Sequence, residues 1–157
     1  MSAYIIRKLF EAKKLSNEVE STVIVSKRFN LVDRPVDILN RHKVDELFDL
    51  DNPRAENLDL IQLCNQLIHS YVFEIGFTGD RQIGGVFFGS DYARKTHCYY
   101  ISIDQFLKTL TRVSVDQIMS SHRERDTKTG EMKSVSRSNM SGTTFCQQFD
   151  FPKLILE

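Results

Sequence analysis

The sequence predicts an α+β domain in which helices pack against a small antiparallel sheet. Apolar residues recur at helical spacing in the first part of the chain, the period changes to two from Tyr71, and helical spacing returns after Asp104. The 157 residues match the size of one ordinary domain, so we expect a single domain over 1–157.

The N-terminal half is expected to be mainly helical. Residues 4–15 place apolar and charged side chains on opposite faces, which predicts an amphipathic helix. The spacing of Asn17 and Glu20 is that of a capping box and predicts a second helix through Val23 to Ser26, although the β-branched run 22–25 favours a strand.

Two further helical regions precede the change of period. A short helix or two is expected within 35–50, after the proline turn at Arg34-Pro35. Residues 55–70 are apolar around more than half of a helical circumference. They predict a central, deeply buried helix.

A three-stranded antiparallel meander is expected next. Residues 71–77, 83–89 and 96–103 are rich in β-favouring side chains and are separated by polar turns. Gly84-Gly85, inside the second of these segments, indicates a bulge or a point of close packing. The aromatic side chains expected to fill the interface between helices and sheet are Phe73, Phe77, Phe87, Tyr99 and Phe106.

The last third of the chain is expected to change from helical to polar. Asp104 is a favourable N-cap for a helix through Val113, with an extension towards Ile118 after a break. Residues 120–142 contain almost no large apolar side chains and predict a polar hairpin with its tip at 126–131, the alternative being a mobile loop. Apolar residues return over 145–156 and predict that the C-terminus docks back on the domain.

Charge and hydropathy exclude several classes of protein. The 21 Lys+Arg balance the 21 Asp+Glu, so the whole protein has no strong field to attract nucleic acid or an anionic membrane. The apolar runs are far shorter than the roughly 20 residues of a spanning helix, and Arg7-Lys8 comes too early for a secretory signal. We therefore expect a cytoplasmic protein that makes no membrane contact.

Cysteine usage and charge distribution add two expectations. Three widely spaced cysteines indicate reduced, packed thiols. Neutrality conceals a net basic segment over 1–28 and a net acidic segment over 29–60. This asymmetry is compatible with complementary pairing between copies of the chain, and equally with contacts inside one copy.

Asn65 and His69 are the first candidate site residues. Being four apart on a predicted helix, they share one face. A histidine with its ordinary pKa of about 6.5 can act as a general acid or base, and an amide can hold a substrate oxygen. The alternative interpretation is that both are buried polar groups that anchor the end of the helix.

The segment from Asp59 to Phe73, together with Phe88-Gly89-Ser90-Asp91, resembles a group of small uncharacterised bacterial proteins of the kind found in mobile and gene-cassette DNA. The Asn-x3-His spacing over 65–69 is similar to the active helix of HEPN domains, many of which are ribonucleases that use Arg-Asn-x-x-x-His. This second resemblance implies a catalytic role for both residues and an all-helical fold. Cys64 stands where that motif has arginine, the usual bidentate partner of phosphate.

Two basic groups are further candidates for binding. Arg81, Asp91 and Arg94 lie near strand ends, with Lys95 and His97, where Arg81 and Arg94 could receive an anion. Arg54 is a candidate neighbour of His69. The alternative interpretation is that these side chains are surface charges that keep sheet edges from pairing with other chains.

The polar arm 120–142 is the second basic group. It could track phosphates, although no aromatic residue is interleaved to stack on bases. The alternatives are a solvated hairpin and an arm for oligomer formation. Its basic side chains are His122, Arg123, Arg125, Lys128, Lys133 and Arg137.

No complete catalytic constellation is present, so we expect a non-enzymatic binding or interaction protein that associates with itself or with a protein partner. A HEPN-like ribonuclease, or an inactive relative of one, using the 58–70 helix is the second hypothesis. Nucleic-acid binding through 120–142 is the third. The histidines are scattered and no Cys-x-x-Cys pair occurs, so neither a metal site nor a cofactor is expected.

Overall fold

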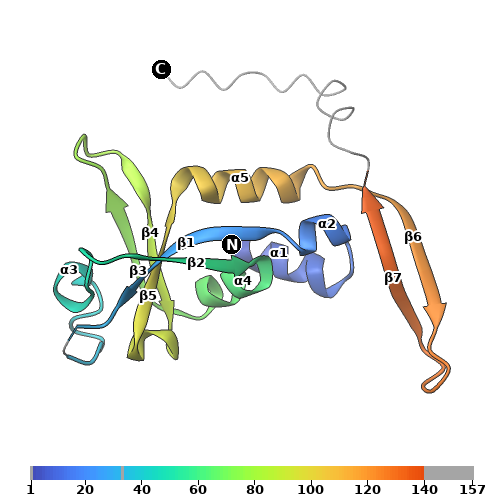
Figure 1. The fold of residues 1–157 in the computed structure, drawn as a ribbon, viewed down its shortest axis with the longest axis horizontal. Helices are drawn as coiled ribbons and strands as arrows, with labels where there is room; N and C mark the ends of the chain where they lie inside the picture. Colours follow the sequence, from blue (N-terminus) through green and yellow to red (C-terminus); the bar gives the residue numbers. More distant parts are fainter. Residues whose placement is uncertain (1, 33, 140–157) are drawn as a thin grey trace.

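The computed structural model describes residues 2–32 and 34–139, and it confirms an α+β fold (Figure 1). Five antiparallel strands form the main sheet in the order β2-β1-β5-β4-β3. The predicted meander is β3-β4-β5, and two further strands extend it. The strands are β1 Val23–Asn30, β2 Arg54–Asp59, β3 Ser70–Phe77, β4 Ile83–Ser90 and β5 His97–Ser102.

Helices connect these strands and cover the sheet. They are α1 Ser2–Glu11, α2 Asn17–Glu20, α3 Val44–Leu47, α4 Leu60–Ile68, the 3-10 helix η1 Ala93–Lys95, and α5 Ile103–Ser114. Two last strands, β6 Ile118–Arg125 and β7 Met132–Asn139, form a separate two-stranded sheet. Figure 1 shows this hairpin standing apart from the main sheet at one end of the molecule.

Residues 23–26 form part of a strand, so the expected continuation of the second helix is wrong. α2 ends after one turn and Val23 begins β1, in which Ile24 is fully buried. Ser16 is the N-cap of α2, and its hydroxyl accepts a hydrogen bond from Val19 N at 3.3 Å. β-branched side chains lose rotamer freedom in a helix but pack well on a pleated surface. The segment therefore forms a strand of the sheet.

Residues 55–59 are also a strand, where a helix was expected. They pair with β1, so that Leu58 lies opposite Ile24. The helix begins only after Asp59, whose Oδ1 accepts a hydrogen bond from Gln62 N at 2.7 Å while Gln62 Oε1 accepts from Asp59 N at 3.0 Å. This reciprocal capping box fixes the start of α4.

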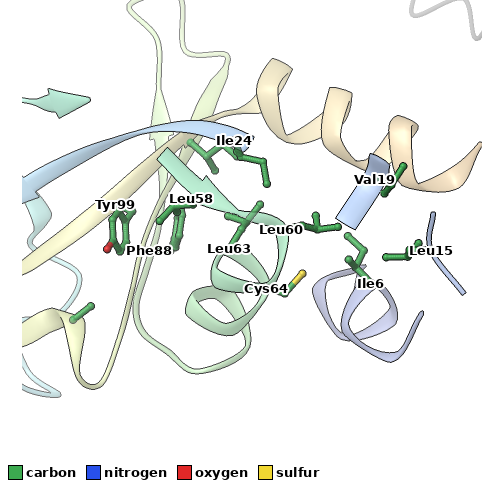
Figure 2. Close-up of a cluster of buried hydrophobic side chains, with 12 residues drawn as sticks. Ile6, Leu15, Val19, Ile24, Leu58, Leu60, Leu63, Cys64, Phe88 and Tyr99 are labelled. Atoms are coloured by element: carbon green, nitrogen blue, oxygen red, sulfur yellow. The ribbon is translucent and has the colours of Figure 1, made fainter. Parts of the chain in front are cut away.

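Buried side chains form two clusters on opposite faces of the sheet. In the larger cluster, Leu63 of α4 meets Ile24 and Phe88 of the sheet, and α1 and α5 pack against the same group (Figure 2). The second cluster contains Phe48 and Val72 together with Val44 and Leu47 of α3. Both faces of the central strands are therefore covered by apolar side chains.

The expected aromatic interface is only partly correct. Tyr99 is buried and Phe106 packs against the larger cluster, while Phe87 belongs to the second cluster. Phe73 and Phe77 are 54% and 65% exposed. They lie on β3, the last strand of the sheet, whereas α4 and α5 pack chiefly over β4 and its neighbours.

The helix and the hairpin predicted for the last third of the chain are both present, but their boundaries differ from those expected. Ser102 is the N-cap of α5, its hydroxyl accepting from Gln105 N at 3.3 Å, so Asp104 lies in the first turn and is not the cap. The expected extension of this helix is wrong, because Ile118 begins β6. β6 and β7 confirm the hairpin predicted for 120–142 as far as Asn139.

The remaining expectations concern the cysteines, the C-terminal residues and membrane-spanning helices. Cys64 and Cys98 are free and buried, as expected, and Cys146 lies outside the described residues. The predicted docking of residues 145–156 also lies outside them. Within 2–32 and 34–139, no helix has the length and apolar character needed to cross a bilayer.

Candidate interaction surfaces

Asn65 and His69 lie at the C-terminal end of α4, where His69 is the C-cap. His69 N donates to the backbone oxygen of Asn65 at 3.0 Å. The Asn65 amide oxygen is buried without a hydrogen-bond partner in the described part of the chain, whereas His69 is exposed. The exposure of His69 does not fit a buried anchor, and the cavities at the sheet and at the hairpin are lined by other residues.

Cys64, the residue that precedes Asn65, is enclosed in the larger cluster at 1% exposure. Burial raises the pKa of its thiol to about 11, with a smaller opposing effect from Arg7. A neutral, enclosed thiol cannot supply the charge or the paired donors of an arginine. In addition, α4 belongs to a fold with a five-stranded sheet, while the HEPN resemblance implies helices alone.

Arg94 and Asp91 come together at η1. Arg94 Nε donates to Asp91 Oδ1 at 2.8 Å, Arg94 Nη1 donates to the backbone oxygen of Val36, and the guanidinium lies 3.9 Å from the ring centroid of Tyr71. These contacts tie the segment around Val36 to the sheet. The guanidinium is thus occupied by structural contacts.

Arg81 and Arg54 lie away from these groups. Arg81 is in the turn between β3 and β4, at the opposite end of that hairpin from the Ser70–Ser90 pair, next to which His69 and Asp91 lie. Arg54 begins β2, and β2 and β3 are the two opposite edges of the sheet. The four candidate binding residues therefore do not form one site around His69.

The basic groups of the hairpin are mostly engaged within the chain. Lys133 pairs with Asp126, and Arg125 Nη1 donates to the backbone oxygen of Gly130 at 2.8 Å. His122 Nε2 lies 3.2 Å from Glu124 Oε1. The remaining basic side chains are Arg123, Lys128 and Arg137, of which Arg137 turns towards the body of the protein.

No group of three or more His, Cys, Asp or Glu side chains within the described ranges is arranged to hold a metal ion.

The edge strand β3 carries a surface that the sequence interpretation missed. Phe73, Ile75 and Phe77 alternate along it, and Ile83 lies opposite Phe77 on β4. Ile75 is 47% exposed and Ile83 51%, so all four apolar side chains are open to solvent. An edge strand also leaves alternate backbone N–H and C=O groups unpaired. The period-two pattern of residues 71–77 signals a strand, but only the order of strands reveals that it lies at an edge.

The opposite edge, β2, has a different character. Its exposed side chains include Arg54 and Asp59, Pro53 directly precedes it, and Glu56 forms an ion pair of 3.3 Å with Arg28 on the neighbouring strand. Charges and proline are common features of edges that do not pair. Of the two edges, only β3 presents an apolar stripe.

The chain matches no family model, no curated protein and no solved structure. The fold and the edge define an α+β protein with one open apolar sheet edge.

Proposed function

We propose that the protein is a non-enzymatic interaction module that associates with a second copy of itself through β3. The observation that carries the proposal is the exposed stripe of Phe73, Ile75 and Phe77 on an unpaired edge strand. Burying large apolar side chains stabilises association by roughly 25 cal/mol per Å² removed from water. Pairing of the two edges adds backbone hydrogen bonds.

The sequence of β3 suits antiparallel pairing with itself. In a two-fold register centred on Ile75, each Ile75 faces its equivalent and Phe73 of one copy faces Phe77 of the other. Glu74 then faces Gly76, so the two carboxylates are not directly opposed. This register joins the two apolar stripes on one face without placing like charges opposite each other.

A matched pair of variants tests this proposal. Ile75→Lys puts a charge into the interface and should leave the fold intact, because the side chain is 47% exposed in the single chain. Val23→Lys introduces the same charge at a 59% exposed position on β1, away from the edge. Light scattering should give about twice the 18.2 kDa chain mass for the native protein and for Val23→Lys, and the single-chain mass for Ile75→Lys. A monomeric native protein at high concentration, or a dimeric Ile75→Lys, would show that β3 is not the interface.

Cross-linking tests the register. In a background with Cys146→Ser, Ile75→Cys should be joined rapidly into a dimer by a short bismaleimide, because directly opposed Cβ atoms lie about 5 Å apart. Cys64 and Cys98 are buried and do not compete. Val23→Cys is the control and should stay monomeric on denaturing gels. Equal cross-linking of both variants would contradict the register.

A further inference from the structure

We propose that a compact phosphate group binds in the cavity between the loop after α1 and the base of the β6–β7 hairpin. This site is separate from the β3 edge and does not depend on self-association. The cavity has a volume of about 380 Å³. Its lining includes Lys13, Lys14, Asp116, Arg123 and Arg137.

Positive charge dominates this cavity. Four of the lining side chains are Lys or Arg, and Asp116 is the one acidic side chain among them. Lys14 and Arg123 belong to none of the ion pairs formed within residues 2–32 and 34–139. Lys13 lies over the Phe10 ring, with Nζ 4.8 Å from its centroid.

Asp116 is occupied by neutral donors. Its Oδ2 accepts from the backbone N of Ser16 at 2.7 Å, and its Oδ1 accepts from Asn139 Nδ2 at 2.8 Å. Through its two carboxylate oxygens, Asp116 thus binds both the N-cap residue of α2 and the last residue of β7. The carboxylate makes no ion pair with the cations beside it, and the cavity keeps an excess of positive charge.

Arg137 supplies the observation that points to a ligand. Its side chain is only 7% exposed, and Nη2 donates to Glu20 Oε2 at 2.5 Å. Nε and Nη1 are buried and have no hydrogen-bond partner in the described part of the chain. Glu20 Oε1 is also unpartnered, so the pair is held by one bond instead of the usual two. A buried donor without a partner is unfavourable, and a phosphate group, like a carboxylate, matches the geometry of a guanidinium fork.

The backbone after α1 places the two lysines at the cavity. Lys14 N donates to Leu9 O at 2.8 Å and Lys13 N donates to Phe10 O at 3.0 Å, the paired bonds of a Schellman motif. Lys13 adopts the left-handed conformation that this motif requires, with φ 55°. The turn that ends α1 therefore fixes the backbone of the two lysines that line the cavity.

The surroundings favour a compact phosphate over a nucleic-acid backbone. A duplex is bound through an extended series of unpaired cations. In this hairpin, His122, between two cavity-lining residues, and Lys133, nearer the tip, already have acidic partners. Of the two hairpin cations outside any ion pair or hydrogen bond named above, Arg123 lies at the recess with Lys13 and Lys14, whereas Lys128 lies at the tip. Inorganic phosphate and a phosphate monoester share the chemistry that this recess would recognise.

Titration calorimetry with inorganic phosphate, in chloride at near-physiological ionic strength, tests the site. We expect saturable binding of one phosphate per chain, at least fivefold weaker in Lys14→Gln and in Arg123→Gln. Lys128→Gln removes the same charge from the hairpin tip, outside the cavity, and should bind phosphate as the native protein does. These variants keep the Glu20–Arg137 pair, so the hairpin should stay attached.

Three results would overturn the proposal: no saturable binding, equal affinity in all variants, or weakening by Lys128→Gln to the same degree as by Lys14→Gln. A short DNA duplex, titrated under the same conditions, distinguishes the source of the phosphate. We expect it to bind no more tightly than inorganic phosphate. Tighter duplex binding that Lys128→Gln weakens would assign the ligand to nucleic acid and refute a compact site.

Discussion

Gly85 on β4 and Tyr100 on β5 are in such close contact that no side chain fits at Gly85. A Cβ atom added there would lie 2.6 Å from the Tyr100 hydroxyl and 2.3 Å from the backbone oxygen of Ile101. The Tyr100 ring also lies 3.1 Å from the Cβ position of Gly76 and its hydroxyl 3.2 Å from that of Gly84. Glycines on two strands thus make room for one aromatic ring on the third.

Gly85→Ala should therefore destabilise the protein by about 2–3 kcal/mol, because the methyl group meets backbone as well as side-chain atoms. Gly79→Ala is the control, since a Cβ at Gly79 meets nothing within 4 Å. Its effect should stay within about 0.5 kcal/mol. Urea unfolding followed by circular dichroism measures both, and a similar midpoint for the two variants would contradict the close contact.

The strands and the close packing of this part of the sheet could be predicted from the sequence. Gly84-Gly85 indicated a bulge or close packing, and both are present, because the β3–β4 register shifts between the Gly76 and Phe77 pairs. The meander was also readable, since turn residues and β-favouring side chains agree there.

In two other segments, the local sequence pattern was compatible with both a helix and a strand. Residues 55–59 continue the apolar helical spacing of α4, yet they pair with β1, which is distant in sequence. The capping pattern of Asn17 and Glu20 predicted a helix that continues through residues 22–26, whereas the β-branched run 22–25 favoured a strand. The strand prevailed because Ile24 gains full burial in the sheet. Only long-range pairing resolves such conflicts.

The candidate surfaces were harder to predict than the fold. Exposure of Phe73 depends on β3 being an edge, which follows from strand order and not from the local sequence. Arg137 was predicted only as one of the basic side chains of the polar arm 120–142, but it is buried against Glu20 of α2, a residue 117 positions earlier. Side chains that meet over such separations leave no signal in one sequence.

His97 predicts how stability depends on pH. Burial is the main cause that lowers its pKa below the ordinary value, the Arg28 charge lowers it further, and Glu56 opposes them. Its Nδ1 lies 2.7 Å from Thr96 Oγ1, while Nε2 is buried without a partner in the described part of the chain. The folded protein therefore holds His97 neutral where the unfolded chain would begin to protonate it.

Because the unfolded state binds more protons than the folded state below the unfolded pKa of about 6.5, stability should fall as pH decreases from 7.5 towards 5.5. His97→Gln removes this contribution, so its urea midpoint should decrease less over the same interval. His42→Gln, at an exposed position, should follow the native curve. Parallel curves for the native protein and His97→Gln would show that His97 titrates equally in both states.

At Lys13 we expect a glycine variant to be more stable than an alanine variant, the reverse of the usual order in a helix. It holds a left-handed conformation, with φ 55°, at the end of α1, where a side chain costs about 1 kcal/mol relative to glycine. Lys13→Gly and Lys13→Ala both lose the contact with the Phe10 ring. Comparing them isolates the backbone, and the glycine variant should be more stable by about 1 kcal/mol. The next residue, Lys14, is the control, because there the glycine variant should be no more stable than the alanine variant. Urea unfolding of the four proteins in phosphate-free buffer decides the question, and a more stable Lys13→Ala would refute the left-handed turn.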